Sequence, residues 1–280
     1  MTIGIYTIAP AMAKSRVIRQ AVAAIERRGG HVLLLPMIAQ AVSRADLICP
    51  QDELMDKSDI LMVFGGDGTM LSAARNAVIT DTPVFGVNLG KIGFLPETEV
   101  PDIDEAVDCI LSGRYRIEER MMLRCRLDDE DMGIALNDVV IARGAVSRMV
   151  NVHIDIDGEA FTQYRADGVI VSTPTGSTAY ALSTGGPIIS PELECLLISP
   201  ICPHSLYNRS VVVGDKTRIA ISVTGANDDA MVTLDGQIAK AVKPGNIVTI
   251  SRAEQTAKFV RLRQESFYRT LHRKLSSDHL

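Results

Sequence analysis

Residues 60–69 read Ile-Leu-Met-Val-Phe-Gly-Gly-Asp-Gly-Thr, and they give the clearest indication of how the first part of the chain folds. Five consecutive large apolar residues that end in glycine predict a short strand buried on both faces of a sheet. Residues 69–78, which follow directly, have the composition of a helix. A buried strand that passes through a glycine turn into a helix is typical of a parallel α/β sheet.

The segments on either side of this stretch alternate in the same way. Further buried strands are predicted at residues 3–8, 31–35 and 84–88, and helices at residues 11–28 and 101–111. The first helix is stopped by Gly29-Gly30, and the second begins with a proline and ends just before Gly113. We therefore expect an α/β N-terminal domain, a parallel sheet with flanking helices, over residues 1–112.

From about residue 115 the hydrophobic period changes to two. Residues 150–156 alternate between apolar and polar side chains, and Asp157-Gly158 is a dipeptide typical of tight hairpin turns. The alternation returns at residues 219–223, and a second Asp-Gly stands at 235–236. We expect a β-rich, mainly antiparallel domain over residues 113–262. A C-terminal helix is predicted within residues 263–280, and it could pack back on the N-terminal domain.

Composition excludes several classes of function. Of the 280 residues, 46% are apolar and 22% charged, so a sizeable core can form. A net charge of -5 without a long basic cluster argues against a nucleic-acid partner. No basic leader and no apolar run of roughly 18 residues is present, so we expect no membrane association and a cytoplasmic location. Five widely spaced cysteines without a Cys-x-x-Cys pair fit neither a disulfide framework nor a zinc site.

The glycine-rich turn after residue 64 is the first candidate site. A helix N-terminus at the end of a strand offers N–H groups and partial positive charge to a phosphate, and glycine lets the ligand approach the backbone. Asp67 could accept a proton from a hydroxyl nucleophile or hold a metal ion. The alternative is a plain turn in which Asp67 caps the following helix. The spacing matches neither the P-loop nor the Rossmann pattern.

Two polar segments later in the chain are further candidates. Seven of the thirteen residues from 172 to 184 are Ser or Thr, directly after an apolar strand. Such hydroxyls can bind phosphate or ribose without adding charge, although an ordinary surface loop has the same composition. Asn137-Asp138 lies between two apolar runs, where both residue types are depleted. Ribose hydroxyls would satisfy this pair, and a turn or bulge is the alternative.

Together these motifs resemble those of the NAD kinase family, over residues 60–190. Gly65-Gly66-Asp67-Gly68-Thr69 resembles its glycine-rich acidic motif, Asn137-Asp138 its asparagine-acid motif, and residues 167–187 its Ser/Thr/Gly-rich motif. The first motif is shared with the wider lipid-kinase and phosphofructokinase superfamily, and the third is far more specific. Residues 88–95 and 234–237 also look like family segments. One departure is Asp138, where the family more often has glutamate.

The resemblance implies an activity and its partners. It implies transfer of a phosphoryl group from ATP, or from inorganic polyphosphate, to the 2′-hydroxyl of the adenosine ribose of NAD, which gives NADP. A divalent metal ion such as Mg²⁺ and a homodimer or homotetramer are also implied. Two alternatives stay open. One is a lipid or sugar kinase of the same superfamily, and the other is a non-catalytic NAD(P)-sensing module, against which the retention of Asp67 counts.

The resemblance also assigns roles to individual residues. Asp67 is expected to be the catalytic proton acceptor, and Asn137 and Asp138 are expected to hold ribose hydroxyls of NAD. No residue is assigned as a metal ligand. The other residues expected to bind substrate are Gly68, Arg148, Arg165, Asp167, Thr175, Thr178, Ala179, Tyr180, Ala181, Leu182, Ser183 and Gln237.

Overall fold

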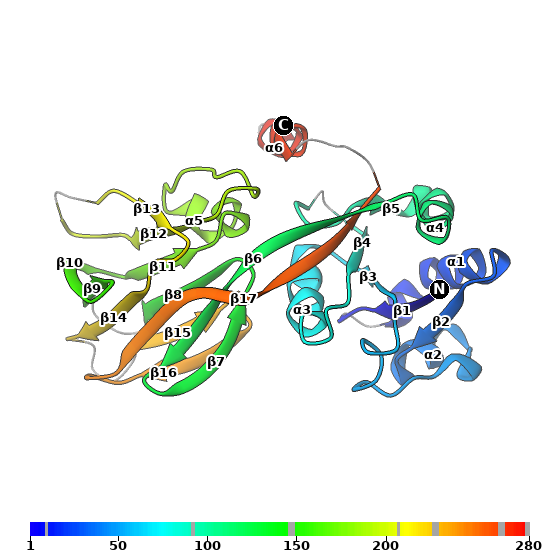
Figure 1. Ribbon diagram of the computed structural model, residues 1–280, viewed down its shortest axis with the longest axis horizontal. Helices are drawn as coiled ribbons and strands as arrows, with labels where there is room; N and C mark the ends of the chain where they lie inside the picture. The colour runs from blue at the N-terminus through cyan, green and yellow to red at the C-terminus, as the bar shows by residue number, and fades with distance from the viewer. Residues whose placement is uncertain are drawn as a thin grey trace. The chain divides into compact units, whose positions relative to one another are not determined.

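The chain forms two compact units joined by two long strands. The computed structural model describes residues 1–8, 11–90, 93–144, 149–205, 208–225, 230–262 and 267–277. The N-terminal unit consists of Met1–Glu119 with Ala257–Leu280, and the central unit of Arg120–Thr256. Strands β6 (Arg116–Leu127) and β17 (Ile247–Arg261) each begin in one unit and end in the other (Figure 1). The boundaries between the units therefore lie inside continuous strands. The change of hydrophobic period near residue 112 does not show where these boundaries fall.

A parallel sheet forms the centre of the N-terminal unit. Its strands are β1 (Thr2–Tyr6), β2 (His31–Leu34), β3 (Ile60–Phe64), β4 (Val84–Asn88) and β5 (Thr98–Glu99). The order is β2-β1-β3-β4-β5 with every pair parallel, and Phe259 of β17 pairs with Val84 of β4, again in parallel. All residues of β3 and β4 are buried, which explains their continuous apolar runs.

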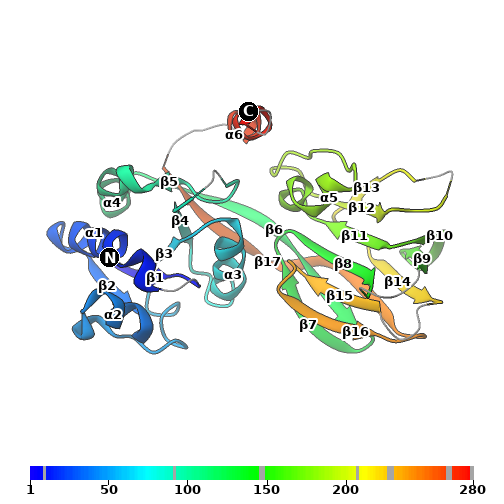
Figure 2. The same cartoon turned by 180° about the vertical axis from the view of Figure 1, so that it is seen from behind.

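Helices cover both faces of this sheet. They are α1 (Ala11–Arg27), α2 (Pro36–Val42), α3 (Asp67–Ala77) and α4 (Ile103–Leu111), with single 3₁₀ turns at Ala45–Leu47 and Val100–Asp102. The last helix, α6 (Phe267–Ser277), belongs to the same unit. The apolar sides of α1, α2 and α4 share one buried cluster with the sheet, and α3 lies on the opposite face (Figures 1 and 2). The sequence pattern did not predict α2, a short helix without a side-chain cap.

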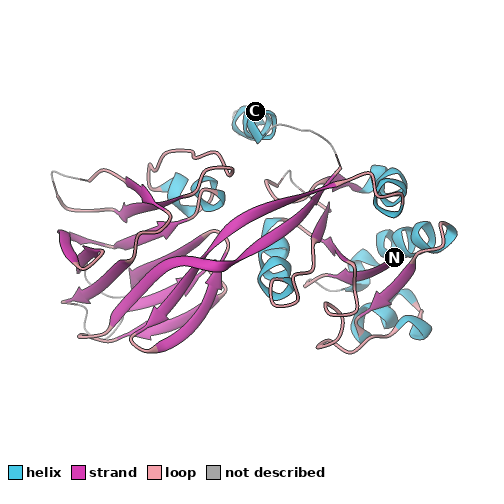
Figure 3. Ribbon diagram, viewed as in Figure 1, coloured by secondary structure: helices cyan, strands magenta, loops and turns pink. Residues whose placement is uncertain are grey.

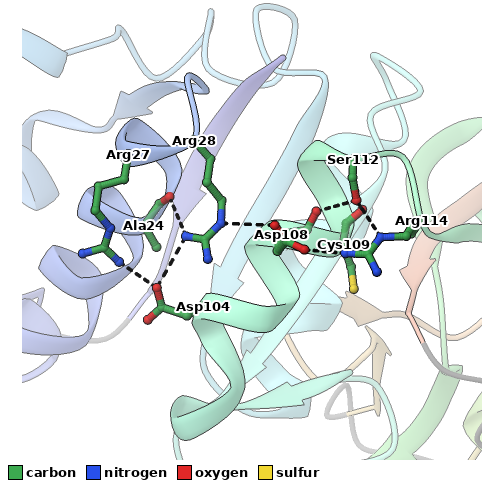
Figure 4. A network of polar contacts seen from close by, with 8 residues as sticks. All are labelled: Ala24, Arg27, Arg28, Asp104, Asp108, Cys109, Ser112 and Arg114. Carbon is green, nitrogen blue, oxygen red and sulfur yellow. Dashed lines mark hydrogen bonds and ion pairs between the residues drawn. The ribbon is translucent and has the colours of Figure 1, made fainter.

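Charged side chains cross the contact between α1 and α4 (Figure 4). Arg27 lies 2.7 Å from Asp104, and Arg28 lies 3.5 Å from both Asp104 and Asp108. These side chains are 30–62% exposed, and such pairs contribute about 0–1 kcal/mol each. The buried apolar side chains beneath them therefore supply most of the stability of this contact.

The central unit is built almost entirely from strands (Figure 3). Besides β6 and β17, its elements are β7 (Glu130–Ala135), β8 (Asp138–Arg143), β9 (Val150–Ile156), β10 (Glu159–Ala166), β11 (Gly168–Ser172), β12 (Cys195–Ile201), β13 (Val211–Gly214), β14 (Ile219–Thr224), β15 (Ala230–Leu234), β16 (Ile238–Val242), a 3₁₀ turn at Thr175–Thr178 and α5 (Tyr180–Ser183). One sheet is antiparallel with the order β13-β12-β11-β8-β15-β16. The other contains β10-β9-β14-β17, together with β6 and β7. Inward-facing residues of both sheets form one core, as in a sandwich.

Both Asp-Gly dipeptides form the hairpin turns that the sequence predicts. Asp157 and Gly158 join β9 to β10 with φ angles of 52° and 86°, and Asp235 and Gly236 join β15 to β16 with 49° and 63°. Two consecutive positive φ angles match the right-handed twist of the flanking strands, and Asp and Gly tolerate them. The predicted fold class, an α/β domain followed by a β-rich domain, is confirmed. Within the described ranges, no helix has the length and apolar character needed to cross a membrane.

Candidate active site

The glycine-rich turn connects β3 directly to α3. Strand β3 ends at Phe64, and α3 begins at Asp67 with Gly66 as its N-cap. Gly66 and Gly68 are both exposed, and no side chain caps the helix through Gly66. The N-terminus of a helix carries partial positive charge and leaves backbone N–H groups for other partners. The turn can therefore accept a phosphate group against its backbone.

The Asp67 carboxylate is held by a neighbouring loop and not by its own helix. Its Oδ1 accepts the backbone N–H groups of Phe94 and Leu95, both at 3.0 Å, and its Oδ2 accepts that of Phe94 at 3.1 Å. A Cβ at Gly93 would lie 2.4 Å from Oδ1, so only glycine lets this loop come so close. The alternative that Asp67 is merely a helix cap is thus not supported.

One oxygen of Asp67 keeps capacity for another partner. A carboxylate offers about four lone-pair sites. Oδ1 receives two backbone N–H groups and Oδ2 one, while Lys274 Nζ forms an ion pair with Oδ2 at 3.6 Å, which is too long for a hydrogen bond. The Asp67 side chain is 34% exposed. Oδ2 is therefore the oxygen that can accept a proton from a bound hydroxyl group.

A second cluster forms in the central unit around Asp235. Its carboxylate accepts three consecutive backbone N–H groups, from Leu136 at 3.0 Å, Asn137 at 2.8 Å and Asp138 at 3.2 Å. In return the Asp235 N–H donates to the Asp138 carbonyl at 2.9 Å. The hairpin turn thereby fixes the segment that leads into β8. Asp235 was not among the predicted site residues, although its Asp-Gly turn was visible in the sequence.

Asp138 is buried beside this cluster. The residue is only 5% exposed and is the first residue of β8. Burial, and secondarily the negative charge of Asp235, raises the pKa of Asp138 to about 7. Asn137 is half-buried in the turn between β7 and β8. The pair therefore lies in a turn that opens a strand, which was the alternative to a position inside one.

Three hydroxyls of the Ser/Thr-rich segment build the loop itself. Ser172 Oγ donates to the Asn137 carbonyl at 3.1 Å, Thr173 Oγ1 to the Leu136 carbonyl at 2.6 Å, and Ser177 Oγ to the Pro174 carbonyl at 2.6 Å. All three residues are fully buried. These three hydroxyls, which were not among the residues predicted to bind substrate, therefore satisfy buried backbone carbonyls. That other hydroxyls of this segment bind phosphate or ribose stays a prediction.

The same segment packs closely against the turn at Asn137. A Cβ at Gly176 would lie 2.1 Å from the Asn137 carbonyl oxygen, so this contact also requires glycine. Thr175 is buried, and its Oγ1 accepts a hydrogen bond from Arg120 Nη1 at 3.2 Å. Thr178 Oγ1 donates a hydrogen bond to the Thr175 carbonyl at 3.2 Å. Of the predicted site residues, Asn137, Asp138, Thr175 and Thr178 are thus brought into one hydrogen-bonded neighbourhood with Asp235.

The remaining predicted residues differ in exposure. Asp167 is half-buried and paired with Arg143 at 2.5 Å, and this carboxylate raises the pKa of the Arg143 guanidinium. Arg165 is exposed on β10, and Arg148 lies outside the described residues. Tyr180, Ser183 and Gln237 are exposed, Ala179 and Leu182 half-buried, and Ala181 buried. Arg143 was not predicted as the partner of Asp167, since nothing in the sequence around an arginine in a strand indicates which carboxylate it will pair with.

The fold and the two clusters define a class of protein. An acidic glycine-rich turn at a strand end of an α/β sheet, joined to a β-sandwich with a buried Asn-Asp turn, is the architecture of a phosphotransferase. Family models narrow this class: residues 42–115 match the ATP-NAD kinase N-terminal domain and residues 136–262 the ATP-NAD kinase C-terminal domain. An NAD kinase from Geotalea daltonii is 42% identical over 252 residues, which cover 89% of this chain and 88% of that protein. The chain belongs to the NAD kinase family.

Solved structures agree with this assignment over nearly the whole chain. Yeast NADH kinase, solved in complex with NADH, superposes with a TM-score of 0.88 at 25% identity and covers 99% of this chain and 87% of its own. An NAD kinase from Archaeoglobus fulgidus, solved in complex with ATP, gives a TM-score of 0.78 at 26% identity and 99% coverage of both chains. The resemblance seen in the motifs is thereby confirmed.

Proposed function

We propose that this protein transfers a phosphoryl group from ATP to the 2′-hydroxyl of the adenosine ribose of NAD and so makes NADP. The observation that carries the proposal is the anchored carboxylate of Asp67 at the open glycine-rich turn. Two further findings support the proposal: this chain belongs to the NAD kinase family, and the similar NAD kinase from A. fulgidus was solved in complex with ATP. Phosphoryl transfer depends mainly on positioning and charge stabilisation, and both are properties of this turn.

In the proposed reaction Asp67 is the general base. Its Oδ2 accepts the proton of the ribose 2′-hydroxyl while the hydroxyl oxygen forms a bond to the terminal phosphorus of ATP. The bond between that phosphorus and the bridging oxygen breaks, and ADP leaves with the electron pair. Backbone N–H groups at the start of α3 stabilise the charge on the phosphoryl oxygens. The hydrogen bonds from Phe94 and Leu95 keep the base in place.

Asn137 and Asp138 are proposed to bind NAD. The Asn137 amide would donate a hydrogen bond to one ribose hydroxyl through its NH2 group, and the Asp138 carboxylate would accept one from the neighbouring hydroxyl. The support is their position in a rigid turn, held by Asp235 from one side and by Ser172 and Thr173 from the other. Thr178, Tyr180, Ser183, Arg165, Asp167 and Gln237 remain proposed contacts of NAD, as does Arg148.

A divalent metal ion, proposed to be Mg²⁺, fits this site as part of the ATP complex. Within the described ranges no group of three or more His, Cys, Asp or Glu side chains could hold a metal. Mg²⁺ is commonly bound by one or two carboxylates, substrate phosphates and water, and Asp67 is the carboxylate at the proposed phosphate site. When bound, the metal neutralises charge on the donor phosphates.

Three further properties belong to the same proposal. A cytoplasmic location is supported by five free cysteines, which are usual in reducing compartments. A homodimer or homotetramer is proposed from the family resemblance, and light scattering on the purified protein would measure it. Inorganic polyphosphate is proposed as a second possible donor.

The decisive experiment is a set of initial rates with NAD and with NADH, each combined with ATP and with inorganic polyphosphate. We expect NADP to form with NAD and ATP in the presence of Mg²⁺. Binding of NAD without any NADP formation would contradict the proposal and would identify a sensing module instead. Phosphorylation of a lipid or sugar, but not of NAD, would assign the protein to another branch of the superfamily.

A further inference from the structure

The C-terminal helix places a cation beside the candidate catalytic base. Lys274 lies on α6, and its Nζ is 3.6 Å from Asp67 Oδ2. More than two hundred residues separate the two side chains in the sequence. Both belong to the N-terminal unit, which includes Ala257–Leu280. The contact therefore arises only because the end of the chain returns to the glycine-rich turn.

The cation contacts the ring of Phe94, and that ring is itself packed against a second aromatic ring from α6. Lys274 Nζ lies over the ring of Phe94, 4.1 Å from its centroid. Phe267, the first residue of α6, packs its ring against that of Phe94, with the two ring centroids 6.3 Å apart. Phe94 in turn donates its backbone N–H to both oxygens of Asp67. One residue, Phe94, thus contacts the base through its backbone and the cation through its ring.

The position of the ammonium group matches a need of the proposed reaction. Asp67 must stay negatively charged next to a donor that itself carries several negative charges, and like charges repel strongly at partly buried sites. The Lys274 side chain is only 28% exposed, so its charge is incompletely screened by solvent. A lysine is a compact charge on a flexible stem, which suits contact with a carboxylate and with phosphate oxygens in turn.

We propose that Lys274 is a positioning residue for phosphoryl transfer, which orients Asp67 Oδ2 and offsets its charge where the phosphate donor binds. The inference rests on the proposed role of Asp67. It makes α6 a functional part of the kinase site, and it assigns a role to a segment beyond both matched domain models, which end at residues 115 and 262.

The test separates charge from packing. Lys274→Met keeps an unbranched side chain over the Phe94 ring and removes the charge, whereas Lys274→Arg keeps the charge. Arg273→Met, at an exposed neighbouring position on α6, is the matched control because it removes one positive charge from the same helix. Steady-state rates of NADP formation are measured for the four full-length proteins with ATP and NAD varied in turn.

For Lys274→Met we expect kcat/KM for ATP to fall about 10- to 100-fold, the usual scale for losing a side chain that orients a functional group. KM for NAD should stay within about twofold, Lys274→Arg should recover much of the loss, and Arg273→Met should behave as wild type. Equal rates for Lys274→Met and Arg273→Met would overturn the proposal. A gain in activity on loss of the charge would overturn it as well, since the contact would then be inhibitory.

A double-mutant cycle tests whether Lys274 acts through Asp67 separately from whether the protein phosphorylates NAD. If Lys274 acts through Asp67, the effect of Lys274→Met is largely lost in the Asp67→Asn background, because residues that act as a unit are non-additive. Full and independent effects of the two substitutions would overturn the link between the side chains. If wild type itself formed no NADP, the proposed function would fail regardless of any effect at Lys274.

Discussion

Asp67 and Asp138 are both acidic residues next to a strand end, but the chain surrounds them differently. The Asp67 side chain is 34% exposed, lies at a helix N-terminus and receives backbone N–H groups from residues 94–95. Asp138 is 5% exposed and lies near the charge of Asp235, and its pKa is raised to about 7. The first environment leaves a carboxylate that a hydroxyl can reach, while the second makes the charge of Asp138 depend on pH near neutrality.

This difference shows how one residue type can serve two tasks. A general base must be accessible to the proton that it accepts and must be fixed in direction, and Asp67 meets both conditions. A buried carboxylate that is neutral below its pKa can donate as well as accept a hydrogen bond, which suits recognition of a sugar hydroxyl. The two environments therefore agree with proton transfer at one site and binding at the other.

The largest expected effect is that of Asp67→Asn. The amide keeps one oxygen for the N–H groups of Phe94 and Leu95 but cannot take the ribose proton. We expect kcat to fall by about 10²- to 10⁴-fold, the usual contribution of general-base catalysis, with a melting temperature close to that of wild type. Initial rates of NADP formation and thermal unfolding measure the two quantities. Turnover at the wild-type rate would remove Asp67 from the mechanism.

Asp235→Ala should affect both stability and NAD binding. It removes the acceptor of three backbone N–H groups, and each unsatisfied group that stays buried costs about 1–3 kcal/mol. We expect the free energy of unfolding to fall by about 3 kcal/mol, since water can replace part of the loss, and KM for NAD to rise about tenfold.

Asp235→Asn is the matched control for that experiment. Asparagine keeps one acceptor oxygen and tolerates the positive φ of 49° at this position. Its loss of stability, measured by urea unfolding, should be smaller than that of Asp235→Ala. Equal losses would mean that the negative charge, and not the hydrogen-bond acceptor, holds the Asn137–Asp138 turn.

Asp138→Asn should change how the stability of the protein depends on pH. The pKa of Asp138 is raised from 3.8 to about 7 in the folded protein, so the folded state binds a proton that the unfolded state has already lost between these values. The stability that this proton contributes is present at acid pH and is lost as pH rises toward 7. The wild type should therefore lose of the order of 2 kcal/mol relative to Asp138→Asn between pH 4 and pH 7.

Substrate binding should follow the same titration. If ionised Asp138 accepts a ribose hydroxyl, KM for NAD in the wild type falls as pH rises from about 6 to about 8, and the dependence is absent in Asp138→Asn. Urea unfolding and rate measurements over this pH range test both statements. A pH dependence that is the same in both proteins would assign the titration to another group.

Asp104→Asn is expected to have the smallest effect and serves as a surface reference for the other carboxylates. Asp104 pairs with Arg27 and Arg28 on an exposed helix contact (Figure 4). Its replacement should change the free energy of unfolding by less than about 1 kcal/mol and leave the rate within about twofold, because exposed ion pairs contribute little. A loss as large as that of Asp235→Ala would show that exposure is a poor guide to the role of a carboxylate in this protein.

Much of the fold could be predicted because its signals are local. The apolar runs at residues 60–64 and 84–88 became strands with those bounds, and both Asp-Gly pairs became hairpin turns. The helix expected at residues 69–78 begins two residues earlier, at Asp67, because the glycine turn is shorter than the composition indicates. Strands β6 and β17 were not recognised, since their burial changes along their length with the two units that they join.

Local patterns in the sequence were enough to predict the fold class, the glycine-rich turn and the Asn-Asp and Ser/Thr-rich motifs, because each consists of neighbouring residues. Which of those polar groups are available to a ligand became known only from the three-dimensional arrangement. It assigned the hydroxyls of Ser172, Thr173 and Ser177 to the loop itself, set Asp235 against the Asn137–Asp138 turn, and brought Lys274 to Asp67. Contacts between residues distant in the chain depend on how whole elements pack, and a local pattern carries no record of that packing.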